Sequence, residues 1–162
     1  MLASGAILGL IAGLALGRTW RPLVAVRIRW LPLLLAGLLV RGIAPLIPGI
    51  GLVLYVFALA STAVVAGANY RIFGALLIAI GGALNLVVVV VNGGMPVDPG
   101  AVAAAGASMP TDALHVLLVD STRLKELADV IAFPLAHSVY SIGDFSIAIG
   151  AFLVPFVLLL RR

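Results

Sequence analysis

Long apolar runs alternate with short polar breaks along the chain, and five of these runs approach the length of a membrane-spanning helix. A helix needs about 20 predominantly apolar residues to cross the hydrocarbon core of a bilayer. The predicted spans are residues 2–17, 30–47, 52–68, 73–91 and 142–160. This pattern predicts an all-α fold, a polytopic membrane helix bundle of five transmembrane helices, with an extracytoplasmic cap made from the loop 92–137.

The amino-acid composition is that of a membrane protein rather than a soluble one. Of the 162 residues, 64% are hydrophobic and 10% are charged, whereas soluble domains are about half apolar and about a quarter charged. A water-soluble globule is excluded on these numbers, and the lack of cysteine excludes a disulfide-stapled scaffold. We expect one membrane domain over residues 1–162, multi-pass in the cytoplasmic membrane.

The first apolar run has the length of a signal-peptide core and ends in small residues. It has no positively charged segment before it and a basic cluster follows it, which favours a retained helix. If this run is cleaved or lies at the interface, four spans remain and the orientation of the rest is unchanged.

Acidic and basic residues are separated along the sequence. All six acidic residues follow residue 97, and the first 97 residues carry only arginines, at positions 18, 21, 27, 29, 41 and 71. The positive-inside rule places the 18–29 cluster, Arg71 and the arginines at 161–162, which lie outside the residues that the structure describes, on the cytoplasmic side. The N-terminus is then outside and the C-terminus inside. Because the basic residues border apolar runs and lack interleaved aromatic residues, we expect the lipid bilayer, and no nucleic acid, as their partner.

Two aspartates are the main candidates for chemistry, because ionisable groups at the edge of a span are costly. Asp144 begins the last span, where Ser141-x-x-Asp144 has the pattern of a capping box. Asp129 lies in a predicted amphipathic helix over about 122–133 whose apolar stripe leaves it off the buried face. There, an ion pair with Lys125 at i,i+4 spacing is the structural alternative.

Taken together, Asp129 and Asp144 support a sharper hypothesis. Both lie on the same membrane face, and two carboxyls held close together share a proton, so that one activates water while the other protonates. This is the chemistry of aspartyl proteolysis, which needs neither metal nor cofactor. The alternative is that the two acids are only a helix cap and half of an ion pair.

Supporting or substrate-binding roles are open for a few other polar residues. Arg41 either snorkels to the outer headgroups or pairs with an outer-face acid, and Asn85 either ties helices together or binds substrate. Asn92 opens the turn N-G-G-M-P, which is either structural or a binding loop. The sequence has two histidines, His115 and His137, and their spacing predicts no metal site. No nucleotide-binding motif is present.

Two resemblances follow from short motifs in the second half of the chain. The combination of N-G-G-M-P (92–96), L-A-D-V-I (127–131) and Y-S-I-G-D (140–144) resembles an uncharacterised family of small bacterial integral membrane proteins. Over about residues 70–160 the chain also resembles lipoprotein signal peptidase (signal peptidase II). G-G-A-L-N (81–85), A-D-V (128–130) and F-P followed by Y-S-I-G-D are similar to that family's motifs. The sequence lacks the family's Asp-Arg pair after the asparagine, and Ser141 replaces an asparagine.

The second resemblance implies that Asp129 and Asp144 form a catalytic dyad at the outer membrane surface. The expected function is therefore an aspartyl intramembrane peptidase-like enzyme acting on a membrane-anchored peptide or a lipid-linked substrate. A non-enzymatic accessory or assembly subunit with membrane-protein partners is an equal alternative. A small transporter or channel ranks third, because conduction needs a polar path and the sequence offers few polar residues for one.

Overall fold

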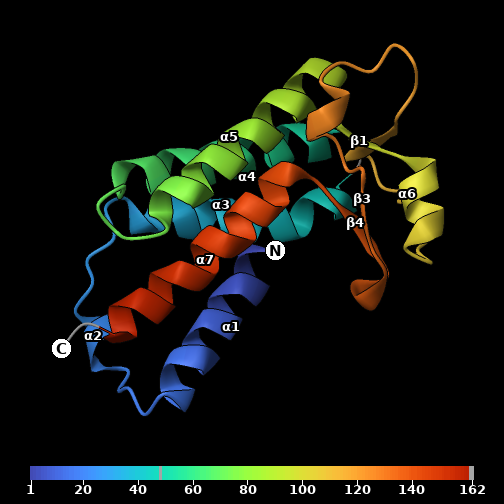
Figure 1. Ribbon diagram of the computed structural model, residues 1–162. Helices are drawn as coiled ribbons and strands as arrows, with labels where there is room; N and C mark the ends of the chain where they lie inside the picture. Colours follow the sequence, from blue (N-terminus) through green and yellow to red (C-terminus); the bar gives the residue numbers. More distant parts are fainter. Residues whose placement is uncertain (48, 161–162) are drawn as a thin grey trace.

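The computed structural model describes residues 1–47 and 49–160 (Figure 1). Its main helices are α1 (Leu2–Ala15), α3 (Leu31–Ile43), α4 (Gly51–Ala68), α5 (Ala75–Asn92) and α7 (Ile142–Leu160), with a short α2 (Arg21–Val24) and a 3-10 turn η1 (Ala44–Leu46). Among the described helices, α4, α5 and α7 are long and apolar enough to cross a membrane. With 14 and 13 residues, α1 and α3 are shorter. The chain is a helical membrane protein with at least these three candidate spans.

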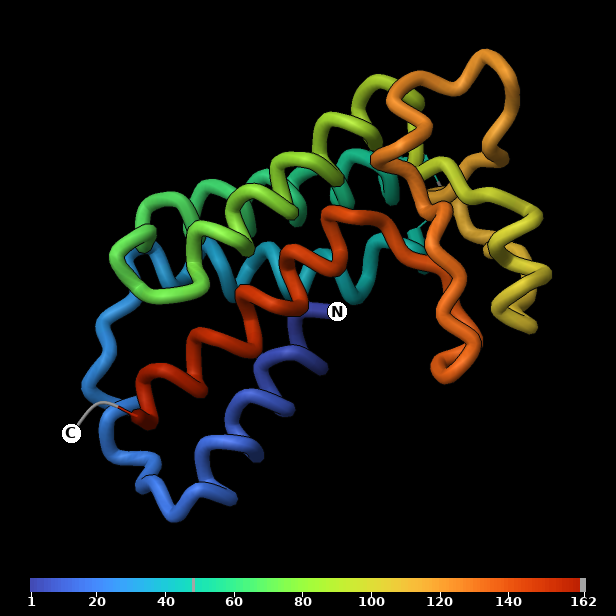
Figure 2. Tube along the Cα trace, in the orientation of Figure 1, coloured from blue at the N-terminus to red at the C-terminus, as the bar shows by residue number. Residues whose placement is uncertain are grey.

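Helix α7 lies at the centre of the bundle, with α1 on one side and α5 on the other, and α4 packs between α5 and α3 (Figures 1 and 2). Glycines allow these close approaches. A Cβ atom on Gly9 of α1 would collide with the backbone of Phe152, and one on Gly81 of α5 would collide with the carbonyl oxygen of Gly143. Small residues let helix backbones approach in this way where lipid supplies no hydrophobic drive.

The segment between α5 and α7 forms a cap at one end of the bundle (Figure 2). It contains β1 (Met95–Val97), α6 (Pro99–Ala104), β2 (His115–Leu117), β3 (Ile131–Phe133) and β4 (Ser138–Tyr140), with 3-10 turns η2 (Lys125–Leu127) and η3 (Pro134–Ala136). Strand β1 pairs with β2 in parallel, and β3 pairs with β4 antiparallel. The fold is therefore mostly helical, and the two small sheets are features that the all-α prediction lacked.

The predicted helix over 122–133 is wrong. Leu124 has a left-handed backbone, η2 lasts only a single turn, and Ala128 is already extended. Backbone pairing with the end of β1 explains the difference: the N–H of Asp129 donates to Pro96 O over 2.9 Å, and the N–H of Asp98 donates to Asp129 O over 3.0 Å. Strand pairing with a distant segment overrides the local helical pattern.

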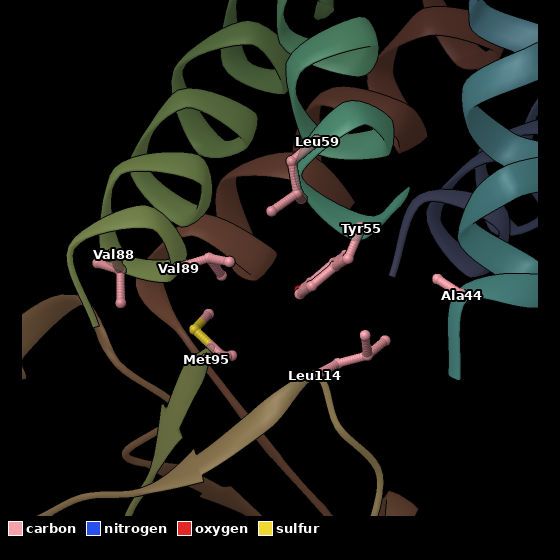
Figure 3. Close-up of a cluster of buried hydrophobic side chains, with 7 residues drawn as sticks. All are labelled: Ala44, Tyr55, Leu59, Val88, Val89, Met95 and Leu114. Carbon is pink, nitrogen blue, oxygen red and sulfur yellow. The ribbon is translucent and has the colours of Figure 1, made fainter. Parts of the chain in front are cut away.

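A buried apolar cluster joins the cap to the bundle. It contains Ala44, Tyr55, Leu59, Val88, Val89, Met95 and Leu114 (Figure 3). Met95 of β1 and Leu114, next to β2, pack against the cap-side ends of α4 and α5. This packing fixes the cap, which carries Asp129, against the helix ends of the bundle.

Candidate functional site

A closed hydrogen-bond network surrounds Asp144 at the start of α7. Its Oδ1 accepts from the side-chain amide of Asn85 over 3.0 Å, and its Oδ2 accepts from the backbone N–H of Ser141 over 3.3 Å. The Oγ of Ser141 accepts from the N–H of Asp144 over 3.0 Å and donates to Asn85 Oδ1 over 2.9 Å. The predicted capping box is present, and Asn85 ties α5 to the start of α7.

The structure places Asp129 differently from the sequence interpretation. Its side chain is buried, with 7% of its surface exposed. It does not pair with Lys125, whose Nζ instead lies 3.8 Å from Asp120 Oδ1. The prediction of an exposed Asp129 with a Lys125 partner is wrong. The segment is extended rather than helical, so residues four positions apart do not lie side by side.

Burial and charge shift the acid–base behaviour of Asp129. Burial raises its pKa to about 8, the negative charge of Asp144 acts in the same direction, and the positive charge of Arg41 opposes it. Asp129 Oδ1 is also the one fully buried side-chain nitrogen or oxygen without a hydrogen-bond partner among residues 1–47 and 49–160. Burial and the negative charge of Asp144 therefore both favour the protonated form of Asp129.

The two aspartates line different cavities. Asp144 lines a bundle cavity of about 320 Å³, together with Asn85, Arg41, Tyr55, Thr62 and Ile147. Asp129 lines a cap cavity of about 270 Å³, together with Asp112, His115, His137, Ser108 and Ser138. Within the described part of the chain no hydrogen bond joins the two carboxyls. The structure thus brings them to the same end of the bundle in separate cavities, and the charge of Asp144 acts on Asp129.

Arg41 contributes a fixed positive charge to the bundle cavity. Its guanidinium lies over the ring of Tyr55, with Cζ 4.4 Å from the ring centroid. In the described residues it makes no ion pair within 4.0 Å. The alternative of a direct acid partner is therefore not realised, and Arg41 acts on the acids at longer range.

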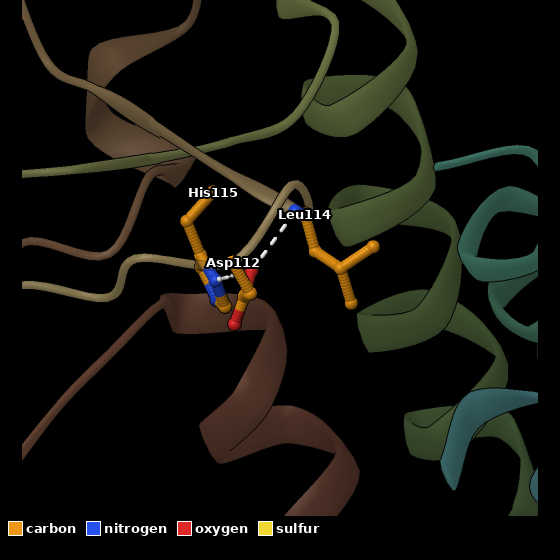
Figure 4. Close-up of polar contacts among 3 residues, drawn as sticks. All are labelled: Asp112, Leu114 and His115. Atoms are coloured by element: carbon orange, nitrogen blue, oxygen red, sulfur yellow. Dashed lines mark hydrogen bonds and ion pairs between the residues drawn. The ribbon is translucent and has the colours of Figure 1, made fainter. Parts of the chain in front are cut away.

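A second acid–base pair in the cap was missed by the sequence analysis. Asp112 Oδ1 accepts from the N–H of Leu114 over 2.9 Å and lies 2.7 Å from Nδ1 of His115 (Figure 4). Desolvation alone raises the pKa of Asp112, but these two hydrogen bonds and the nearby positive charges outweigh it and lower the pKa overall. The spacing Asp112-x-x-His115 was the available signal.

The remaining candidate residue, Asn92, has a structural role at the end of α5. Its amide donates to Val88 O and to Arg123 O, and its Oδ1 accepts from Arg123 N–H over 2.9 Å. It therefore anchors the loop before η2, and it lines a different, shallow surface pocket. Across the described residues, no group of three or more His, Asp or Glu side chains is arranged to hold a metal ion.

The fold and the site define a helical membrane protein in which one acid of a small β-containing cap lies under the influence of a second acid at the start of α7. The chain belongs to the family of unknown function DUF5317, whose family model matches residues 14–156. No curated protein and no solved structure matches the chain.

Proposed function

We propose that this protein is a membrane peptidase of the aspartyl type, in which Asp129 and Asp144 act as an acid and a base. The observation that carries the proposal is the asymmetry between the two carboxyls. Asp129 is buried, unpartnered and protonated at neutral pH, whereas both oxygens of Asp144 accept hydrogen bonds. Dyads of this kind work because one carboxyl holds a proton while the other does not.

The reaction assigns one proton transfer to each acid. Asp144 takes a proton from a water molecule as its oxygen attacks the peptide carbonyl carbon, and Asp129 gives its proton to the carbonyl oxygen. When the resulting gem-diol collapses, Asp144 protonates the leaving nitrogen and Asp129 recovers a proton from the diol hydroxyl. Asn85 and Ser141 are positioning residues, because they orient Asp144 through the hydrogen bonds described above.

The proposal requires the bundle cavity and the cap cavity to merge when a peptide binds. The segment between the two acids, which contains the β3–β4 hairpin, is the part of the chain that would have to shift. Phe133 and Tyr140 of this hairpin contact Phe145 of α7, with ring centroids 6.1–6.5 Å apart, so this aromatic contact would have to rearrange. The expected substrate is a membrane-anchored or lipid-linked peptide whose cleaved bond lies at the outer surface.

We further propose that α1 and α3 complete a five-span bundle, with the N-terminus outside and the C-terminus inside. Glycine contacts support a parallel α1–α7 pair, since Gly5, Gly9 and Gly13 face Ala148, Phe152 and Leu159 in order. The arginines of segment 18–29 and Arg71 lie in the connections at the end opposite the cap.

Labelling of single cysteines tests this orientation. The chain has no cysteine, so Thr19→Cys and Ser108→Cys each introduce one thiol, and a membrane-impermeant maleimide labels it only if it faces the outside. Labelling of position 108 alone in intact cells supports this orientation, and labelling of position 19 alone contradicts it.

Peptide cleavage by the reconstituted protein tests the proposed function. Purified wild type in lipid vesicles is mixed with single-span model peptides, and new N-termini are measured by mass spectrometry. We expect cleavage by wild type, none by Asp129→Asn or Asp144→Asn, and unchanged cleavage by Asp120→Asn, which removes an exposed acid. Circular dichroism and thermal melting check that each variant is folded. Cleavage that persists in both folded aspartate variants would refute the assignment. Absence of cleavage by wild type, with stoichiometric membrane partners, would favour an accessory subunit.

A further inference from the structure

We infer that the cap cavity binds a primary ammonium or guanidinium group, as presented by a Lys or Arg side chain of a peptide. The inference goes beyond the proposed cleavage and does not require it. It rests on the polar groups that the cavity contains, on the lack of a Lys or Arg side chain paired with them, and on the apolar residues that line the rest of its wall.

The first group is the Asp112 carboxylate. It is held in place from two sides, by the N–H of Leu114 over 2.9 Å and by Nδ1 of His115 over 2.7 Å (Figure 4). Both contacts involve Oδ1, so in the described structure no hydrogen bond occupies Oδ2. A fixed carboxylate with a free oxygen is an acceptor for a charge-assisted hydrogen bond.

The second group is Asp129, which is independent of Asp112 in sequence and in structure. Its side chain is 7% exposed and lines the cavity, yet Oδ1 has no hydrogen-bond partner. A buried polar atom left without a partner costs about 1–3 kcal/mol. An ammonium or guanidinium ligand carries several N–H donors and is able to supply Asp129 and Asp112 together.

No Lys or Arg side chain of the described residues donates a hydrogen bond to Asp112 or Asp129. Over residues 1–47 and 49–160, the ion pairs within 4.0 Å are His115–Asp112 and Lys125–Asp120. No Lys or Arg side chain therefore neutralises Asp112 or Asp129 by direct contact. Arg41 and Asp144 act on Asp129 through space with opposite signs, and the two histidines complete the set of titratable groups around the cavity.

The shape and lining of the cavity select an organic cation. Its volume of about 270 Å³ has room for one long side chain, and Val97, Val102 and Val139 form an apolar part of its wall. Lys and Arg bury an aliphatic stem against such a surface while the charged head reaches polar groups. A divalent metal ion fits less well, because the described residues contain no cluster of three or more suitable ligands.

Nuclear magnetic resonance of the two histidines tests the inference directly. The chain has only two histidines, and both line the cap cavity. The probes are n-butylammonium, which resembles a Lys side chain, and 1-butanol, which has the same stem without the charge. In detergent-solubilised protein labelled at the histidine rings, we expect n-butylammonium to shift both ring signals saturably near neutral pH and 1-butanol to leave them in place.

Three matched variants locate the binding. Asp112→Asn should weaken n-butylammonium binding about tenfold or more, the loss expected when the charged partner of a hydrogen bond is removed, and Asp129→Asn, which replaces a carboxyl whose raised pKa favours the protonated form, should weaken it by less. Asp120→Asn makes the same charge change at an exposed position outside the cavity and should bind like wild type. If Asp129→Asn fails to fold, Asp112→Asn and the comparison of the two probes still decide the question.

Three results would overturn the inference: no saturable shift with n-butylammonium, equal shifts with 1-butanol, or equal weakening by Asp120→Asn. The assay measures binding without cleavage, so its failure leaves the peptidase proposal untouched. Conversely, binding of n-butylammonium by a protein that cleaves no peptide would support this site and refute only the proposed reaction.

Discussion

The side-chain amide of Asn85 joins the middle of α5 to the first turn of α7 by donating a 3.0 Å hydrogen bond to Oδ1 of Asp144. Asn85 is 2% exposed, and its own oxygen accepts from the hydroxyl of Ser141, which is fully buried. In a low-dielectric interior such networks are strong when complete and costly when broken. The network therefore holds the Asp144 carboxylate in one orientation at the cap end of the bundle.

Replacement of Asn85 by alanine should lower the free energy of unfolding by about 1–3 kcal/mol, because Ser141 and Asp144 both lose a buried partner. Reversible unfolding in mixed detergent micelles measures the change. Ser146→Ala is the matched control, since Ser146 also bonds across the α5–α7 interface, to Leu77 O over 2.8 Å, but does not contact the network. If Asn85→Ala reduces peptide cleavage and Ser146→Ala does not, Asn85 positions Asp144. Equal loss in both variants would indicate a general packing effect.

Ser141→Ala and Asn85→Ala should show non-additive effects on stability. Ser141→Ala alone removes a helix cap, which costs about 1 kcal/mol, and it also removes a hydrogen bond to Asn85. Because the two residues share partners, we expect the double variant to lose less than the sum, with a coupling of about 0.5–3 kcal/mol. The four unfolding free energies of the cycle measure this. Additivity within experimental error would show that the two residues act independently.

Glycines at the α1–α7 and α5–α7 contacts should not tolerate a methyl group. A Cβ on Gly9 or Gly81 would collide with backbone atoms of α7, which cannot move as a side chain can. We expect Gly9→Ala and Gly81→Ala to cost about 1–3 kcal/mol each, the usual range for overpacking. Gly42 of α3 is the control because a Cβ there meets no atom within 4 Å, so Gly42→Ala should leave stability unchanged or raise it. Thermal unfolding in one detergent compares the three variants.

The helices of the bundle could be predicted closely from the sequence. The predicted spans 52–68 and 142–160 agree within a residue with α4, Gly51–Ala68, and α7, Ile142–Leu160. Apolar runs bounded by turn residues carry this information locally. The glycine contacts were not predicted, although Gly5, Gly9 and Gly13 repeat every four residues in the sequence, the spacing of close helix packing.

The cap and half of the candidate site could not be predicted in the same way. The position of Asp129 depends on backbone hydrogen bonds with Pro96 and Asp98, which are far away in the sequence. The apolar pattern within residues 122–133 gives no information about such long-range pairing. Asp144, by contrast, takes its place from Ser141 three residues earlier, and that pattern was visible. The pairing of Asn85 with Asp144 links two separate spans, so sequence alone left open whether Asn85 joins helices or binds substrate.

Stability should fall as pH rises through the range in which Asp129 is protonated only in the folded protein. Its pKa is raised to about 8 by burial and by the charge of Asp144, compared with about 3.9 in an unfolded chain. Between these values the folded state binds the extra proton, so its stabilising contribution is complete below about pH 4 and is lost as pH approaches 8. The slope is at most about 1.4 kcal/mol per pH unit for one group.

Asp129→Asn removes this titration and should flatten the profile, whereas Asp120→Asn should retain it. Unfolding free energies measured across this range check both variants. A wild-type profile that rises between pH 5 and 8, or one that is unchanged in Asp129→Asn, would show that Asp129 ionises normally and would remove the acid from the proposed pair.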